Sequence, residues 1–155
     1  MLIAAVAAAL GFGAYRAIVD GRFSGTHRVR GGEAVTTVAA PASVLEGAGL
    51  EHELGERATL LQFSSAFCAP CRATRRILAD IADAVPGVVH VEVDAEHHLE
   101  LVRRLGVLRT PTTLVLDAHG VEVTRAAGAP RREQVLAALA QAVEPEGDSP
   151  IQPGG

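Results

Sequence analysis

Cys68 and Cys71 have the clearest capacity for chemistry, because they are the two cysteines of the chain and only Ala69 and Pro70 separate them. The apolar run "ATLLQFSS" (58–65) before them is typical of a buried strand, and helical periodicity begins at Ala69. Cys68 should therefore lie at a helix N-terminus, where unpaired amides and the helix dipole stabilise a thiolate. We expect the pKa of Cys68 to fall below the value of about 8.5 for a free thiol.

The spacing of the pair suits reversible disulfide formation. Cys71 follows Cys68 by one helical turn, close enough for the two sulfurs to bond, and Pro70 restricts the backbone between them. In thiol–disulfide exchange, Cys68 would attack a substrate disulfide, and Cys71 would then attack Cys68 and release the reduced substrate. This chemistry needs no cofactor beyond the Cys68–Cys71 disulfide itself, and the residues leave its direction open.

Two other interpretations of the Cys-x-x-Cys motif compete with this one. The first is half of a tetrahedral zinc site, which His97 and His98 could complete on paper. Because adjacent residues of a helix point apart, we expect both histidines on a solvated helix face and predict no metal site. The second interpretation is a pair of structural thiols, since cysteine is often buried.

Strand-like and helix-like segments alternate around the cysteines. Pro86 and Gly87 end the first helix, Asp94 can cap the second, and Pro130 suits the first turn of the last. The sequence predicts strands at 58–65, 88–94, 112–117 and 121–127, and helices from Ala69, around Leu99, Val102 and Leu105, and around Val135, Leu136, Leu139 and Val143. This order indicates an α/β fold with a parallel βαβ unit, then a hairpin, and with helices on both faces of a mixed sheet.

The stretch from Phe67 to Arg72 resembles the thioredoxin-family signature, which is an aromatic residue, Cys-x-Pro-Cys and a basic residue. The stretch "GVLRTPTTLVLDAHG" (106–120) is similar to the family's second signature, and Gly128 matches a glycine that follows its last strand. The resemblance implies a thioredoxin-like fold over residues 43–143. It also implies a cis peptide bond before Pro111, opposite the cysteines, and a substrate-binding surface of Phe67, Ala69 and the Thr110 backbone.

Gln62 departs from the family pattern. Thioredoxins usually carry a buried Asp at this position, which helps to move the proton of the second cysteine, whereas an amide cannot accept a proton. The candidates for proton transfer are therefore Gln62, His90 and Glu92, with His90, Glu92 or water taking over the missing role. Phe67 also stands where the family usually has Trp. These departures favour a specialised partner over a general disulfide reductant.

The net charge of the 155-residue chain is −4, and it is unevenly distributed. Residues 1–32 hold four arginines and one aspartate, whereas residues 33–155 hold ten arginines and seventeen acidic residues. An acidic domain of this kind is a poor binder of nucleic acid. We expect its partners to be proteins with thiols or disulfides, together with an unidentified electron donor or acceptor.

Residues 1–20 are apolar apart from Arg16 and Asp20 and reach the length of a membrane-spanning helix. A cleaved signal peptide and a buried helix are alternatives, but no basic residue precedes the run and its cleavage site is weak. We predict a transmembrane anchor at 1–20, a linker at 21–42 in which "EAVTTV" could instead form an edge strand, and a disordered tail at 144–155. The positive-inside rule places the domain in the cytoplasm, with the extracytoplasmic side left open because the chain could start upstream of Met1.

Two functions fit these features. The first is a membrane-tethered thiol–disulfide oxidoreductase that reduces or exchanges the disulfides of protein substrates. The second is a non-catalytic redox sensor or docking module for a membrane partner, in which the dithiol regulates binding without turnover. The intact Phe-Cys-Ala-Pro-Cys run favours the enzyme, whereas Gln62 favours the module slightly.

Overall fold

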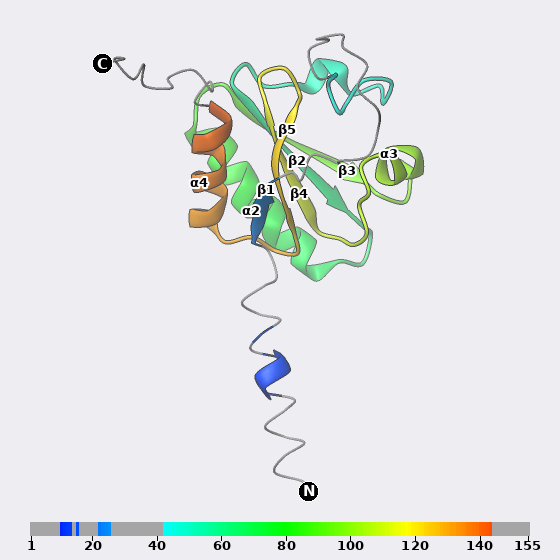
Figure 1. The fold of residues 1–155 in the computed structure, drawn as a ribbon, viewed down its shortest axis with the longest axis vertical. Helices are drawn as coiled ribbons and strands as arrows, with labels where there is room; N and C mark the ends of the chain where they lie inside the picture. Colours follow the sequence, from blue (N-terminus) through cyan, green and yellow to red (C-terminus); the bar gives the residue numbers. More distant parts are fainter. Residues whose placement is uncertain (1–9, 14, 16–21, 26–41, 144–155) are drawn as a thin grey trace, which may run out of the picture.

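The computed structural model describes residues 10–13, 15, 22–25 and 42–143, which are built around a five-stranded sheet (Figure 1). The strand order is β1-β5-β4-β2-β3. The strands are β1 (Phe23–Gly25), β2 (Ala58–Ser64), β3 (Val88–Asp94), β4 (Thr112–Asp117) and β5 (Glu122–Ala127). The helices are the short 3-10 helix η1 (Glu51–Glu53) and the α-helices α2 (Ala69–Ala84), α3 (Leu99–Arg104) and α4 (Arg132–Val143).

β2 and β3 form the parallel βαβ unit that the sequence predicts. They pair from Ala58 opposite Val88 to Ser64 opposite Asp94, and α2 connects them. β4 runs antiparallel to β2 and continues into β5 as a hairpin. Every residue of β2 is buried, because this strand has a neighbour on each side within the sheet and other segments pack on both of its faces. The prediction of a mixed α/β sheet is therefore confirmed.

Helices cover both faces of the sheet. Side chains alternate along β2, so Leu60 and Leu61 enter different halves of the core. Leu60 lies in a buried cluster with Leu78 of α2 and apolar side chains of α4. Leu61 lies in a second cluster with Leu101 of α3 and apolar side chains of the segment 44–54. α2 and α4 thus share one face, and α3 lies on the other (Figure 1).

One end of the sheet gathers several chain segments around the cysteines. Ser64 of β2 is level with Asp94 of β3, and Phe63 lies opposite Thr112 at the start of β4. Thr112 in turn pairs with Ala127 at the end of β5. The loops after β2, β3 and β5 and the loop before β4 therefore meet at one end, where α2 and α4 also begin (Figure 1). We call this the dithiol end.

β1 lies within the segment 21–42, which we expected to be a linker. Phe23 pairs with Ala126 and Gly25 with Thr124, antiparallel to β5. These three residues therefore form a strand and not a linker. The strand was not predicted because a segment this short shows no two-residue period in the sequence. Residues 26–41, which include the alternative edge strand "EAVTTV", lie outside the described residues.

The predicted membrane anchor at 1–20 falls largely outside the described residues. Within this segment the structure describes 10–13 and 15, which are helical. In the part of the chain that the structure describes, no helix has the length and apolarity needed to cross a bilayer. The predicted tail at 144–155 also lies outside the described residues.

Packing between α2 and the sheet holds the start of α2 in place, and it can be tested at Leu78. This side chain is fully buried between the helix and β2. Leu78→Ala should lower the free energy of unfolding by about 2–5 kcal/mol, because it leaves a cavity in the core. Urea denaturation measures this change. The matched substitution Leu136→Ala, at a side chain that is 41% exposed on α4, should cost about 1 kcal/mol or less. Equal losses for the two variants would contradict this packing.

Candidate active site

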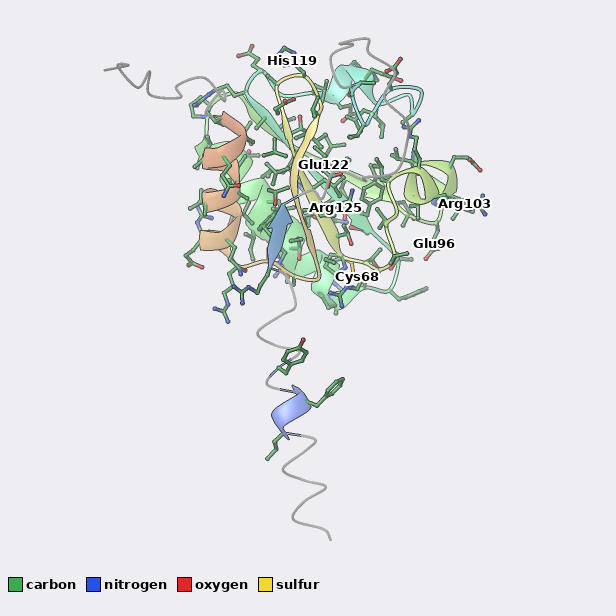
Figure 2. All side chains as sticks on the ribbon, in the orientation of Figure 1. Cys68, Glu96, Arg103, His119, Glu122 and Arg125 are labelled. Atoms are coloured by element: carbon green, nitrogen blue, oxygen red, sulfur yellow. A yellow bond between two sulfur atoms is a disulfide. The ribbon has the colours of Figure 1, made fainter. Side chains whose placement is uncertain are left out.

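Cys68 marks the change from strand to helix at the dithiol end (Figure 2). Its backbone is extended (φ −93°, ψ 96°), and it is the N-cap of α2. Pro70 fits the first turn of this helix, because an amide N–H there has no partner within the helix. The amide of Cys71 donates a hydrogen bond to Cys68 Sγ at 3.1 Å. A donor in this position stabilises negative charge on the sulfur.

Cys68 and Cys71 are joined by a disulfide, and their Cα atoms are 5.2 Å apart. The two residues differ in exposure. Cys71 is 2% exposed, whereas Cys68 is half-buried. Cys68 is therefore the more accessible of the two sulfur-bearing side chains, and Cys71 is the more shielded. The structure thus brings together the pair that the spacing predicts.

The loop before β4 lies beside the cysteine loop. The Thr110–Pro111 peptide bond is cis, as the resemblance implies. The hydroxyls of Ser65 and Thr110 are 3.0 Å apart and link the two loops. The N–H of Gly128 donates to the Pro111 carbonyl at 2.7 Å. Gly128 has a φ of 101°, which side chains with a Cβ rarely adopt, so a glycine suits this contact.

Gln62 lies fully buried beneath Cys71, on the side of β2 that faces α2. Its Nε2 donates to the carbonyl oxygen of Cys71 and to Ser64 Oγ, both at 3.0 Å. Its Oε1 lies 3.1 Å from His90 Nε2. Since both ends of the amide are occupied, Gln62 fixes the position of the Cys71 backbone and has no capacity to accept a proton.

His90 lies on the far side of Gln62 from Cys71. The Nε2 atom of His90 donates to Gln62 Oε1, because the amide nitrogen of Gln62 is engaged elsewhere. Burial is the main cause that lowers the pKa of His90 below its ordinary value of 6.5; Arg75 adds to this effect and Glu92 opposes it. The imidazole is therefore neutral at pH 7, and Gln62 separates it from Cys71.

Glu92 is the one charged group among the three proton-transfer candidates. Its Oε2 lies 2.6 Å from Arg75 Nε, and its Oε1 accepts hydrogen bonds from Arg75 at 2.9 Å and from the Ser64 hydroxyl at 2.5 Å. Burial works against ionisation of Glu92, but the hydrogen bonds from Arg75 and Ser64 outweigh it and lower the pKa of the carboxyl. Glu92 is therefore ionised at neutral pH.

A pocket of about 280 Å³ connects Glu92 with the cysteines. Its lining includes Cys68, Cys71, Ser64, Arg75 and Glu92. Ser64 and Arg75 were not among the site residues predicted from the sequence, although their spacing carried a signal. Ser64 is two residues after Gln62 on the same side of a strand, and Arg75 is four residues after Cys71 on the same side of a helix.

Two apolar side chains project into solvent near Cys68. Phe67, expected at a substrate surface, is 100% exposed, and Ala69 beside it is also exposed. Leu108, in the loop before β4, is 95% exposed. Leu108 could not be predicted from the sequence, because an apolar residue in a loop carries no periodic signal. Thr110, which directly precedes the buried Pro111, is half-buried.

The two histidines considered for a zinc site do not line the cysteines' pocket, but both contact Asp94, which does. His97 Nδ1 is 2.9 Å from Asp94 Oδ2, and His98 Nδ1 is 3.1 Å from the Asp94 carbonyl oxygen. Within the described ranges, no group of three His, Cys, Asp or Glu side chains is arranged to hold a metal ion.

Comparison with known proteins points in one direction. The family model described as "Thioredoxin-like domain" matches residues 52–143. "Thioredoxin H-type 1" from Nicotiana tabacum is 33% identical over 78 residues, which are 50% of this chain and 61% of that protein. The thioredoxin of Alicyclobacillus acidocaldarius is 30% identical over 91 residues, which are 58% of this chain and 86% of that protein. The match thus spans less than two thirds of the Nicotiana relative.

Solved structures agree on the fold. A thioredoxin from Fasciola hepatica has a TM-score of 0.54 and 24% identity, with 65% of this chain and 95% of that chain covered. A mutant thioredoxin from Halobacterium salinarum has a TM-score of 0.57 and 17% identity, with 72% of this chain and 97% of that chain covered. Since the family model extends over more than half of the sequence, this chain belongs to the thioredoxin-like domain family.

Proposed function

We propose that this chain is a thiol–disulfide oxidoreductase that reduces or exchanges the disulfides of protein substrates. One observation carries the proposal: a half-buried Cys68 at the head of α2 is bonded to a buried Cys71. This difference in exposure gives the two sulfurs different tasks. Membership of the thioredoxin-like family and relatives named as thioredoxins support the same function.

The reaction transfers two electrons from the dithiol to the substrate. The Cys68 thiolate attacks one sulfur of the substrate disulfide, and a Cys68–substrate disulfide forms while the other substrate sulfur leaves and takes up a proton. The Cys71 thiol then loses its proton, and its thiolate attacks Cys68 Sγ. The Cys68–Cys71 disulfide forms, and the second substrate thiolate is released. An external thiol or dithiol donor must then reduce the pair, and the reverse sequence oxidises a substrate dithiol.

The proton of Cys71 needs an acceptor, and we assign this role to Glu92. Cys71 is buried, so bulk water does not reach its sulfur directly, but Cys71 and Glu92 line the same pocket. A polar space of this size can hold water that connects the two groups. Gln62 cannot take a proton, and His90 lies behind Gln62. Gln62 is therefore a positioning residue, and Ser64 orients the Glu92 carboxylate.

The substrate would lie across the two loops at the dithiol end. Phe67 and Ala69 offer exposed surface on the cysteine side, and the Thr110 backbone offers hydrogen-bonding groups on the other. Pro111, which follows Thr110, is buried and has no backbone N–H, so it would contribute an apolar contact at this position.

The roles of the two cysteines predict different outcomes for two serine variants. In the full chain, Cys68→Ser should abolish reduction of a peptide disulfide, because no nucleophile remains. Cys71→Ser should still attack and should accumulate the mixed disulfide, which mass spectrometry detects as a covalent adduct. Turnover by Cys68→Ser at the wild-type rate would refute Cys68 as the nucleophile. A wild-type chain without any turnover would leave the redox sensor or docking module.

The assignment of Glu92 predicts a specific kinetic defect. Glu92→Gln should slow release of the substrate from the mixed disulfide by roughly tenfold or more at pH 7, because the Cys71 proton loses its acceptor. The defect should shrink as the pH rises and hydroxide takes over. Quenched single-turnover reactions, resolved by mass spectrometry, measure this step.

Two further variants control this test. Glu96→Gln removes an exposed carboxylate outside the pocket and should leave the rate unchanged. Adding Gln62→Asp to Glu92→Gln places a carboxylate beneath Cys71 and should restore part of the rate. A Glu92→Gln chain with the rate and pH profile of the wild type would refute the assignment.

We further propose that the apolar run at 1–20 tethers the domain to a membrane, with the cytoplasmic side favoured by the arginines that follow it. The full chain should then stay in the membrane pellet after extraction at alkaline pH, whereas a chain without residues 1–20 should be released. Release of both chains would contradict the tether. Labelling of Cys68 in intact cells by an impermeant thiol reagent would place the domain on the outer side instead.

A further inference from the structure

We propose that the dithiol end is a docking surface for disulfide-bearing polypeptides with acidic and apolar residues next to the reactive cysteine. The inference rests on the proposed function, because exchange at Cys68 requires a partner that brings a disulfide. It goes beyond that function by naming the chemistry that selects the substrate. Two features carry it: the arginines gather at this end, and two exposed apolar side chains lie near Cys68.

The arginines come to the dithiol end from four separate elements. Arg72 lines the cysteine pocket, and Arg76 follows it by one turn on the exposed surface of α2. Arg109 lies in the loop before Pro111, and Arg22 directly precedes β1, where Phe23 is level with Ala126. The exposed arginines here also include two at the start of α4, so that the set is Arg22, Arg72, Arg75, Arg76, Arg109, Arg131 and Arg132.

Among the residues that the structure describes, fewer acidic side chains than arginines lie at this end. Glu92 is held by Arg75, and Asp94 contacts His97. Glu96 and Glu133 are exposed near the same end. Arginine charge therefore exceeds acidic charge around the cysteines.

The opposite end of the domain has the reverse charge. Cys68 and His119 mark the two ends in Figure 2. Three segments lie at the end that His119 marks: the segment before β2, the end of α2 and the turn between β4 and β5. The acidic residues of these segments are Glu46, Glu51, Glu53, Glu56, Asp83 and Asp117. An acidic domain with a basic dithiol end orients an approaching acidic partner towards Cys68.

The apolar part of the surface comes from Phe67 and Leu108. Both are almost entirely exposed, and their loops are linked by the Ser65–Thr110 contact. Large apolar side chains rarely remain this exposed in a group unless a partner covers them. Apolar contacts at the centre with charges around them are typical of protein interfaces.

Chemistry selects a polypeptide among the possible anionic partners. Nucleic acids and lipids would also be attracted by a basic surface, but neither carries a disulfide that Cys68 could attack. A peptide segment can pass between the two loops and present its cystine sulfur to the half-buried Cys68. The observations therefore favour an acidic protein substrate.

Peptide binding tests this inference independently of turnover. Two fluorescently labelled peptides share an apolar core with serine in place of the reactive cysteine, and they differ only in glutamate or arginine flanks. With the full chain in non-ionic detergent, the peptide with glutamate flanks should bind roughly tenfold more tightly than the peptide with arginine flanks at low salt. This difference in affinity should become smaller at high salt. Fluorescence anisotropy measures both affinities.

Matched variants locate the surface. Arg72→Glu combined with Arg132→Glu should remove the preference for the acidic peptide, whereas Arg57→Glu, at the opposite end, should retain it. Leu108→Ser should lower the affinity for both peptides by the same factor. Reduction of a neutral peptide disulfide, measured in parallel, reports on the proposed function separately.

Equal affinities for the two peptides would overturn the docking surface, even if the neutral disulfide is still reduced. A second result would also refute the proposal: equal affinities for the two peptides, together with slower alkylation of Cys68 when phosphatidylglycerol is added to the detergent micelles. That result would assign the basic end to a lipid surface. Acidic preference that survives the Arg72→Glu and Arg132→Glu pair would place the binding site elsewhere and refute the proposal. Acidic preference without Cys68-dependent turnover would support the surface and refute the enzyme.

Discussion

The site depends on one constraint, which is the fixed position of the short loop that connects β2 to α2 and ends at Cys68, the N-cap of the helix. β2 is buried along its whole length, and α2 is held against the sheet by Leu78 and Ile81. Both ends of the intervening loop are therefore fixed, and the Cys68 sulfur stays at the N-terminus of the helix. The amide of Cys71 reaches this sulfur, and the carbonyl of Cys71 is held from below by Gln62. Packing of the core thus positions the two sulfurs.

The polar groups beneath the cysteines divide between two strands. β2 supplies a neutral amide, Gln62, and β3 supplies a carboxylate, Glu92. In the parallel register Gln62 lies opposite Glu92, and Ser64 bridges from β2 to the carboxylate. Arg75 from α2 completes this arrangement and keeps the charge of Glu92 balanced in the oxidised protein. In the proposed mechanism, a base on the neighbouring strand would serve Cys71 without placing a charge directly under it, where burial would be costly.

Local motifs predict the parts of the site that lie close together in the sequence. The cysteines, Pro70 and the proline before β4 could be identified from their neighbours, and apolar periodicity located β2 and α2. The link from Glu92 through Ser64 to Arg75 could not be identified in the same way, because it depends on the register of β2 against β3 and on the rotation of α2. β1 and Leu108 were missed for a related reason: a three-residue strand and a single exposed side chain leave no periodic pattern.

The central claim is that the fold makes Cys68 a reactive thiolate and protects Cys71. Alkylation of the fully reduced chain by iodoacetamide across a range of pH, with each cysteine followed by peptide mass spectrometry, tests this claim most directly. The account predicts that Cys68 reacts at pH values well below those needed by a free thiol, while Cys71 remains largely unmodified. Alkylation of both cysteines at the rate and with the pH dependence of free cysteine would contradict it.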